Sequence, residues 1–208
     1  MILILAVLIG LLAGIIRAYI RKFHFSQPQI NLLWLVPVAF LPQLLSFYLP
    51  ATRNRIPDVL ASFSLISSQL LLLLFAWVNR KQPGFLYLGV GLCLNLTVIA
   101  LNGGFMPIRP EAVLRIYPEI PKSVWQIGER LGFGKDIVIP LAETKLWWFS
   151  DYFTTPKLFP YKIAFSLGDI LLAIGAFWFF WSLGNKPKQN INYERLKVIN
   201  HAHDDIAI

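Results

Sequence analysis

The stretch FSLGDILLAIG, residues 165–175, places an acid, Asp169, where the last apolar run of the chain begins. A long polar segment ends just before it, so this stretch marks a change from loop to helix. Ser166, three residues earlier, forms with Asp169 a pattern typical of a helix capping box, and the helix dipole stabilises an acid in the first turn. An ionisable group at membrane depth is also a candidate for function. Two interpretations of Asp169 therefore stand, a helix cap and a functional acid.

The composition is typical of an integral membrane protein. Of the 208 residues, 56% are hydrophobic and 14% are charged, whereas soluble domains carry about 25% charged residues. Residues 31–50 and 59–78 contain no charged side chain, and uncharged runs of about 18 residues or more predict membrane spans. The net charge of +8 is interpreted as an orientation signal and an attraction to anionic lipids at the cytoplasmic face. No nucleic-acid partner is expected, because no dense basic patch with aromatic residues lies outside the apolar runs.

The hydrophobic pattern predicts an all-α fold with five transmembrane helices, at about residues 2–20, 30–49, 59–78, 85–101 and 161–183. A long loop, residues 102–160, separates the last two spans and is expected to carry short helices, one beginning near Pro110 and one over residues 123–131. Residues 184–208 form a polar tail. In the first span, Ala6, Gly10 and Gly14 form a stripe that allows another helix to approach closely. Two internal prolines predict a kink in the second span.

The distribution of cations predicts the orientation. Cytoplasmic loops are enriched in lysine and arginine. The loop after the second span has only Arg53 and Arg55, offset by Asp58. The loops after the first and third spans and the tail carry more cations, namely Arg17, Arg21, Lys22, Arg80, Lys81, Lys186 and Lys188. The N-terminus and the long loop are therefore expected outside, and the C-terminus in the cytoplasm.

Three amides, Gln43, Gln69 and Asn95, fall near the middle of three spans. An amide that faces lipid is costly, so these side chains should turn inward and find partners. They predict either an interhelical hydrogen-bond cluster or a polar site for a small solute. Asn102 lies seven residues after Asn95, on nearly the same helical face, and would extend this polar line to the outer surface.

No established catalytic motif is present, so no catalytic residue, metal or cofactor is predicted. The single cysteine, Cys93, has no partner for an internal disulfide. His201 and His203 could chelate a metal, but they lie in a polar tail that favours a mobile end. An external acid pair, Asp151 and Asp169, could in principle perform acid–base chemistry.

Three ordered motifs resemble a family of uncharacterised bacterial membrane proteins that is defined only as a domain of unknown function. They are Asn102-Gly103-Gly104-x-Met106-Pro107, then Thr144-Lys145-Leu146-Trp147 with Asp151, then Ser166-x-Gly168-Asp169 before an apolar helix. Ser150 stands where glycine is expected. The resemblance implies a bacterial inner-membrane fold, and it adds no activity.

Three functional hypotheses follow. The first, favoured by the lack of a catalytic set, is a non-enzymatic accessory or assembly subunit with a membrane protein partner. The second is a small-solute or lipid-handling transporter that uses the mid-membrane amides. The third is a membrane enzyme at the outer interface. The candidate polar cluster consists of Asn95, Asn102, Gly103, Gly104, Asp151, Ser166 and Asp169.

Overall fold

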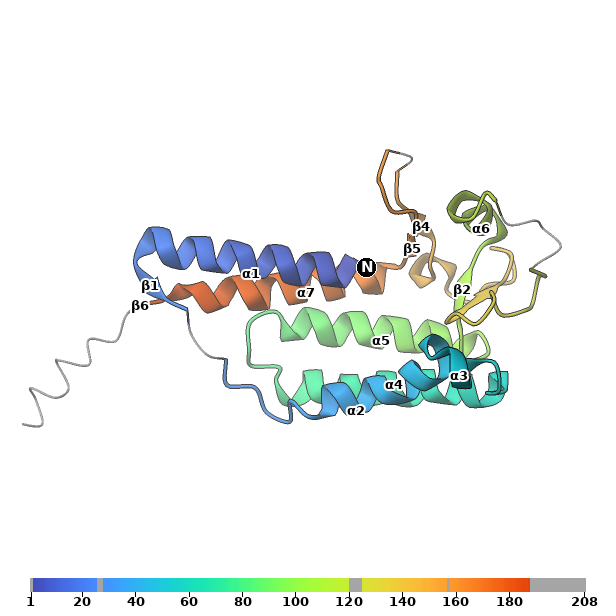
Figure 1. Ribbon diagram of the computed structural model, residues 1–208, viewed down its shortest axis with the longest axis horizontal. Coiled ribbons are helices and arrows are strands. Elements are labelled where there is room, and N and C mark those ends of the chain that lie inside the picture. The colour runs from blue at the N-terminus through green and yellow to red at the C-terminus, as the bar shows by residue number, and fades with distance from the viewer. Residues whose placement is uncertain (1, 26–27, 120–124, 157, 188–208) are drawn as a thin grey trace, which may run out of the picture.

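The structure is a computed structural model that describes residues 2–25, 28–119, 125–156 and 158–187, and it is mostly helical (Figure 1). Its α-helices are α1 (Ile2–Arg21), α2 (Leu35–Gln43), α3 (Pro50–Arg53), α4 (Asp58–Val78), α5 (Phe85–Leu101), α6 (Pro110–Ile116) and α7 (Leu167–Ser182). A π-helical turn, Leu44–Tyr48, continues α2 directly after Pro42. This irregular turn lies where the sequence predicted a proline kink.

The long helices pack in a row. α1 lies against α7, α7 against α5, α5 against α4, and α4 against α2 (Figure 1). After the long loop, the chain therefore returns to place α7 between α1 and α5. The loop segments with α6 gather at one end of the row, next to the starts of α1 and α7.

Glycines allow the close approach of three of these helices. A Cβ atom added to Gly10 or Gly14 would lie 2.7 or 2.6 Å from a carbonyl oxygen of α7, which confirms the contact stripe expected on the first span. Gly91 and Gly168 face one another in the same way across α5 and α7, since a Cβ on Gly91 would lie 2.6 Å from the Gly168 oxygen. Just before α5, Gly84 and Gly175 of α7 make a second close contact of this kind.

Within the described part of the chain, two helices, α1 and α4, are long and apolar enough to cross a membrane. Three shorter apolar helical segments, Leu35–Tyr48, Phe85–Leu101 and Leu167–Ser182, lie beside them in the row. Length and composition thus suggest membrane association.

Small strand pairs order the loop ends. β2 (Met106–Ile108) pairs in parallel with β3 (Asp136–Val138), and Asp151 forms a bridge to Ile108 on the other edge of β2. β4 (Phe153–Thr154) pairs with β5 (Ala164–Phe165) just before α7. At the opposite end of the row, β1 (Phe23–His24) pairs with β6 (Lys186–Pro187). β2, α6 and β3 enclose a small apolar core that includes Ile108, Val113 and Val138.

Two predicted helices begin later than expected. The second starts at Leu35, because the Asn79 side chain bonds both the backbone N–H and the carbonyl of Asn31 and holds that segment in a turn. The fifth starts at Leu167, because residues 164–165 belong to β5.

The predicted helix over residues 123–131 is wrong within its described part, residues 125–131. Gly128 has a φ of 85° and its N–H donates to Val138, while the Leu131 N–H donates to Asp136. Pairing with β3 therefore replaces helical hydrogen bonds. Residues 123–124, and the tail histidines at 201 and 203, lie outside the described residues.

Candidate functional site

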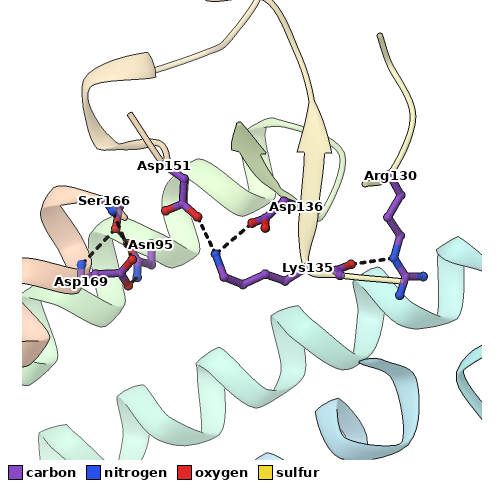
Figure 2. A network of polar contacts seen from close by, with 8 residues as sticks. Asn95, Arg130, Lys135, Asp136, Asp151, Ser166 and Asp169 are labelled. Atoms are coloured by element: carbon purple, nitrogen blue, oxygen red, sulfur yellow. Dashed lines mark hydrogen bonds and ion pairs between the residues drawn. The ribbon is translucent and has the colours of Figure 1, made fainter. Parts of the chain in front are cut away.

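Ser166 and Asp169 form the capping box expected from sequence. Ser166 Oγ accepts from the Asp169 N–H at 3.0 Å, and Asp169 Oδ2 accepts from the Ser166 N–H at 3.1 Å. Asn95 of α5 completes the cluster: its Nδ2 donates to Asp169 Oδ1 at 3.0 Å, and its Oδ1 accepts from Ser166 Oγ at 2.9 Å. The cap of α7 is thus joined to the interior of α5, as Figure 2 shows.

Asn102 takes a different partner. It ends α5 and is buried, with its Nδ2 donating to the carbonyls of Val98 and Lys145 and its Oδ1 accepting from the Lys145 N–H. The following Gly103 and Gly104 have φ values of 79° and 85°, so they form a left-handed turn that glycine adopts readily. Asn102 therefore holds the loop segment at Lys145 against the end of α5.

The three amides that the sequence placed near the middle of the predicted spans have separate environments. Gln43 donates to Ser68 Oγ at 2.6 Å across the α2–α4 contact. Asn95 bonds Ser166 and Asp169 at the α5–α7 contact. Gln69 Oε1 is buried without a partner among the described residues. The described hydrogen bonds do not join the three amides into one cluster.

A charged group that the sequence argument did not assemble surrounds β2. Lys135 lies beside Met106 on one edge, where its carbonyl accepts from the Met106 N–H, and Asp151 lies on the other edge, where its N–H donates to Pro107. The Lys135 side chain reaches across to Asp151 Oδ2 at 2.7 Å and to Asp136 Oδ1 at 3.0 Å (Figure 2). The parallel pairing of residues 106–108 with 136–138 is a long-range feature, so spacing along the chain does not reveal this contact.

Asp151 is the most deeply buried member of this group. Its side chain is 2% exposed, and Oδ1 has no hydrogen-bond partner within the described part of the chain. Burial raises the pKa of Asp151 to about 7, against the lowering effect of Lys135, and the nearby carboxylates of Asp136 and Asp169 add to the rise.

Lys135 stays charged. Burial alone would lower its pKa, but the carboxylates of Asp136, Asp151 and Asp169 outweigh burial and hold the pKa well above its usual value. Its side chain as a whole is 42% exposed, while the ammonium contacts both Asp136 and Asp151.

A cavity of about 280 Å³ opens beside these groups. Asp151 and Asp169, the external acid pair of the sequence argument, both line it, together with Lys135 and Asp136. Lys162 lies on its lining and is exposed to solvent. The remaining wall is mainly apolar and includes Ile2, Leu3, Ile108, Ile116, Phe165 and Leu172. The cavity therefore has one charged side and a wall formed partly by the starts of α1 and α7.

Arg130 attaches the loop segment at residues 130–134 to α4 and to the π-helical turn that continues α2. Its side chain is 5% exposed and bonds Asp58 at 3.0 Å, with further bonds to the carbonyls of Gly134, Phe133 and Ser46. The guanidinium also lies over the Phe47 and Phe105 rings. Arg130 therefore holds residues 130–134 against the start of α4. Its role was not predictable from the sequence, because its partners are distant along the chain.

The structure shows why serine is tolerated at position 150, where the motif has glycine. Its φ of −73° needs no glycine, and its buried hydroxyl donates to the Trp147 carbonyl at 2.6 Å. Among the described residues, no group of three or more histidine, cysteine, aspartate or glutamate side chains could hold a metal ion.

The fold and the site define a mostly helical protein with two long apolar helices and a charged cavity under a long loop. The chain belongs to the DUF5317 family, described as a family of unknown function, whose model matches residues 27–181. It is also similar to an uncharacterized protein of Thermotoga maritima, with 28% identity over 180 residues that cover 85% of this chain and 86% of the relative. No solved structure matches the chain.

Proposed function

We propose that this chain is a bacterial plasma-membrane protein that crosses the membrane five times and binds an amphiphilic small molecule in its outer cavity. The two long apolar helices and the three shorter ones beside them support the spans. Large apolar side chains on α1, including Ile4, Leu8 and Leu12, are exposed, as expected of a lipid-facing helix. The distribution of lysine and arginine supports an outer N-terminus and a cytoplasmic C-terminus.

The observation that carries the binding function is the cavity of about 280 Å³ beside Lys135, Asp136 and Asp151. The cavity combines charged side chains with apolar walls. Such a site fits a molecule with a polar head and an apolar body.

Ligand retention tests the binding function. Ala164 lines the cavity, so Ala164→Phe should fill part of it. Native mass spectrometry of protein purified in mild detergent should detect a small bound molecule on the wild type and on a Glu143→Trp control, where the substituted residue is exposed and lies outside the cavity lining. The Ala164→Phe variant should lose it. Equal retention by all three proteins would contradict the proposal.

Thiol labelling tests the topology. In a Cys93→Ala background, cysteine introduced at the exposed Glu143 should react with an impermeant reagent in intact cells, whereas cysteine introduced at the exposed Lys81 should not. The reverse pattern would overturn the orientation.

Membrane lipid is proposed as a further partner. A groove of about 510 Å³ runs between α4 and α5, lined by apolar side chains such as Leu70, Leu73 and Leu86, with Arg80 among its lining residues. An acyl chain fits the apolar part, and Arg80 would meet an anionic head group. Arg80→Gln should therefore reduce the anionic phospholipid retained in native mass spectra, while Arg55→Gln in a different loop should not.

The enzyme hypothesis uses the same cavity. Asp151 and Asp169 both line it, and a carboxyl with a pKa near 7 is suited to general acid–base work. Chemical change of a bound amphiphile by the wild type but not by Asp151→Asn would support this second candidate, and recovery of the amphiphile unchanged would remove it.

The transporter has less support, because the mid-membrane amides take separate partners. The accessory-subunit role stays a prediction, and its test is stable co-purification with a membrane complex.

A further inference from the structure

We propose that the β4–β5 hairpin docks on the outer lipid surface, with the side chains of Leu158, Phe159 and Tyr161 among the lipid head groups and the adjoining acyl chains. This inference goes beyond ligand binding in the cavity, and it rests on the membrane-spanning part of the proposed function. Exposed apolar side chains, an ordered neck, a place beside the first span and a positive charge support it.

The end of the hairpin exposes its apolar side chains instead of packing them. Leu158 is 100% exposed, Tyr161 is 54% exposed and Phe159 is 42% exposed. Pro156 and Pro160, which adjoin them in the sequence, are exposed as well. A group of exposed apolar side chains marks an interaction site. Tyrosine is enriched at membrane–water interfaces, because its ring is apolar and its hydroxyl can reach water.

Thr155 holds the neck of the hairpin in shape. Its N–H donates to the Ile163 carbonyl at 3.1 Å, and its hydroxyl donates to the Tyr161 carbonyl at 2.8 Å. The same hydroxyl oxygen accepts from the Ile163 N–H at 3.2 Å. Beyond this neck, the Phe159 N–H donates to the Pro156 carbonyl at 3.0 Å. An ordered loop thus presents the apolar side chains, which lowers the entropy cost of docking.

The hairpin lies beside the outer end of α1. Its second strand leads directly into α7, since β5 ends at Phe165 and α7 begins at Leu167. Ile2 and Leu3 of α1 line the same cavity as residues 162–165. Figure 1 shows the hairpin projecting to one side of the row, across the direction of the long helices. Under the proposed topology this direction runs along the membrane plane, so the hairpin lies level with the outer ends of the spans.

The charge of the hairpin favours an anionic lipid surface. Residues 152–168 contain no acidic side chain, whereas Lys157 and Lys162 flank the apolar residues in the sequence. Lys162 is exposed. A lysine beside an apolar surface can extend its stem along that surface and place its ammonium among phosphate groups. An acidic protein partner would use the lysines but would leave the apolar side chains without a matching surface.

Exposed aromatic side chains also lie near both ends of the helices. Trp77 lies in the last turn of α4, and Trp181 lies in the last turn of α7. At the end where the hairpin lies, Trp148 is exposed in a short helical turn, Trp147–Phe149, that contacts α5 and α7. Aromatic belts at two interfaces are typical of membrane proteins. Tyr161 of the hairpin adds to the outer belt.

Fluorescence quenching in lipid nanodiscs tests the docking. The full chain, in a Cys93→Ala background, would carry an environment-sensitive fluorophore at Leu158→Cys, in nanodiscs of phosphatidylcholine and phosphatidylglycerol. Leu158 is fully exposed, so the change removes no packing within the protein. We expect a blue-shifted emission that is quenched by lipid with a nitroxide near the head group and only weakly by iodide in the water. The matched control is the exposed Glu143→Cys, where iodide should quench strongly and lipid should not.

A third site separates this inference from the proposed spans. Leu12 is exposed on α1, and a fluorophore at Leu12→Cys should be quenched by lipid with a nitroxide deep in the acyl chain. If Leu12 is quenched and Leu158 responds like Glu143, the spans stand and the docking is overturned. Blue-shifted emission at Leu158 that neither quencher reduces would mean that a protein covers the hairpin, which also overturns the lipid assignment. If lipid does not quench at Leu12, the proposed spans fail and the docking fails with them.

Discussion

Asn95 donates from Nδ2 to Asp169 Oδ1 at 3.0 Å, and this bond ties the first turn of α7 to the interior of α5. Asp169 is therefore both a helix cap and an interhelical acceptor. Asn102 lies two turns further along α5, about 10 Å away by helical rise, and bonds Lys145 instead. The described hydrogen bonds thus join Asp169 to Asn95, while Asn102, another member of the candidate polar cluster, bonds the loop.

Replacing Asp169 by asparagine should cost more than the loss of a cap. Both carboxylate oxygens accept hydrogen bonds, so an amide at this position would point an N–H at another donor. We expect Asp169→Asn to lower the free energy of unfolding by about 1–3 kcal/mol, the usual penalty for an unsatisfied buried polar group. Thermal unfolding in detergent measures this. Exchanging both residues, with Asn95→Asp added, should recover part of the loss, and strictly additive effects would contradict the pairing.

The glycine pairs between α5 and α7 should tolerate no side chain. A Cβ added to Gly91 would lie 2.6 Å from the Gly168 oxygen, whereas one added to Gly89 would meet only the Ala76 Cβ, at 3.9 Å. Gly91→Ala should therefore destabilise the protein by about 1–3 kcal/mol, as overpacking does. Gly89→Ala in the same helix should be neutral or stabilising, because alanine is the better helix former. Similar melting temperatures for the two variants would show that α5 and α7 do not meet at Gly91.

Two asparagines at helix ends should hold different segments. Asn102 bonds the N–H and carbonyl of Lys145, and Asn79 bonds those of Asn31. Aspartate at either position keeps an acceptor but loses the donor, so each substitution should cost about 1–3 kcal/mol. Limited proteolysis separates them: Asn102→Asp should expose the bond after Lys145, and Asn79→Asp should not. Faster cleavage after Lys145 in both variants would contradict the local role of Asn102.

Local chemistry made much of the helical part predictable. The fourth span matches α5 at both ends, because Gly84 precedes it and the Asn102 turn follows it. The Ser166–Asp169 cap was also visible, since its partners lie three residues apart. By contrast, hydropathy does not reveal the late starts of α2 and α7. The first depends on a bond from the distant Asn79, and the second depends on the short β4–β5 pair.

The cavity was only partly predictable. Asp151 and Asp169 were paired as candidates because they are acids in the outer loop and its junction. Lys135 and Asp136 were missed, because the sequence around them is typical of a polar loop. Only the pairing of β2 with β3 brings them to Asp151. The glycines of α5 and α7 did carry a signal, since Gly84 and Gly91, like Gly168 and Gly175, are seven residues apart.

The Asp151 carboxyl should make stability depend on pH. Its pKa rises from an ordinary 3.8 to about 7 on folding, so the folded state binds the proton more tightly. The resulting stabilisation is fully present below about pH 4 and is lost as the pH rises through 7. Lys135, whose pKa is raised, remains charged throughout. Raising the pH from 5 to 8 should therefore lower the free energy of unfolding of the wild type more than that of Asp151→Asn. Thermal unfolding across this range measures it, with Glu143→Gln as the comparison for general effects of buffer and detergent. A wild-type advantage that instead grows with pH would mean that Asp151 is stabilised as a carboxylate and that its ion pair with Lys135 outweighs its burial.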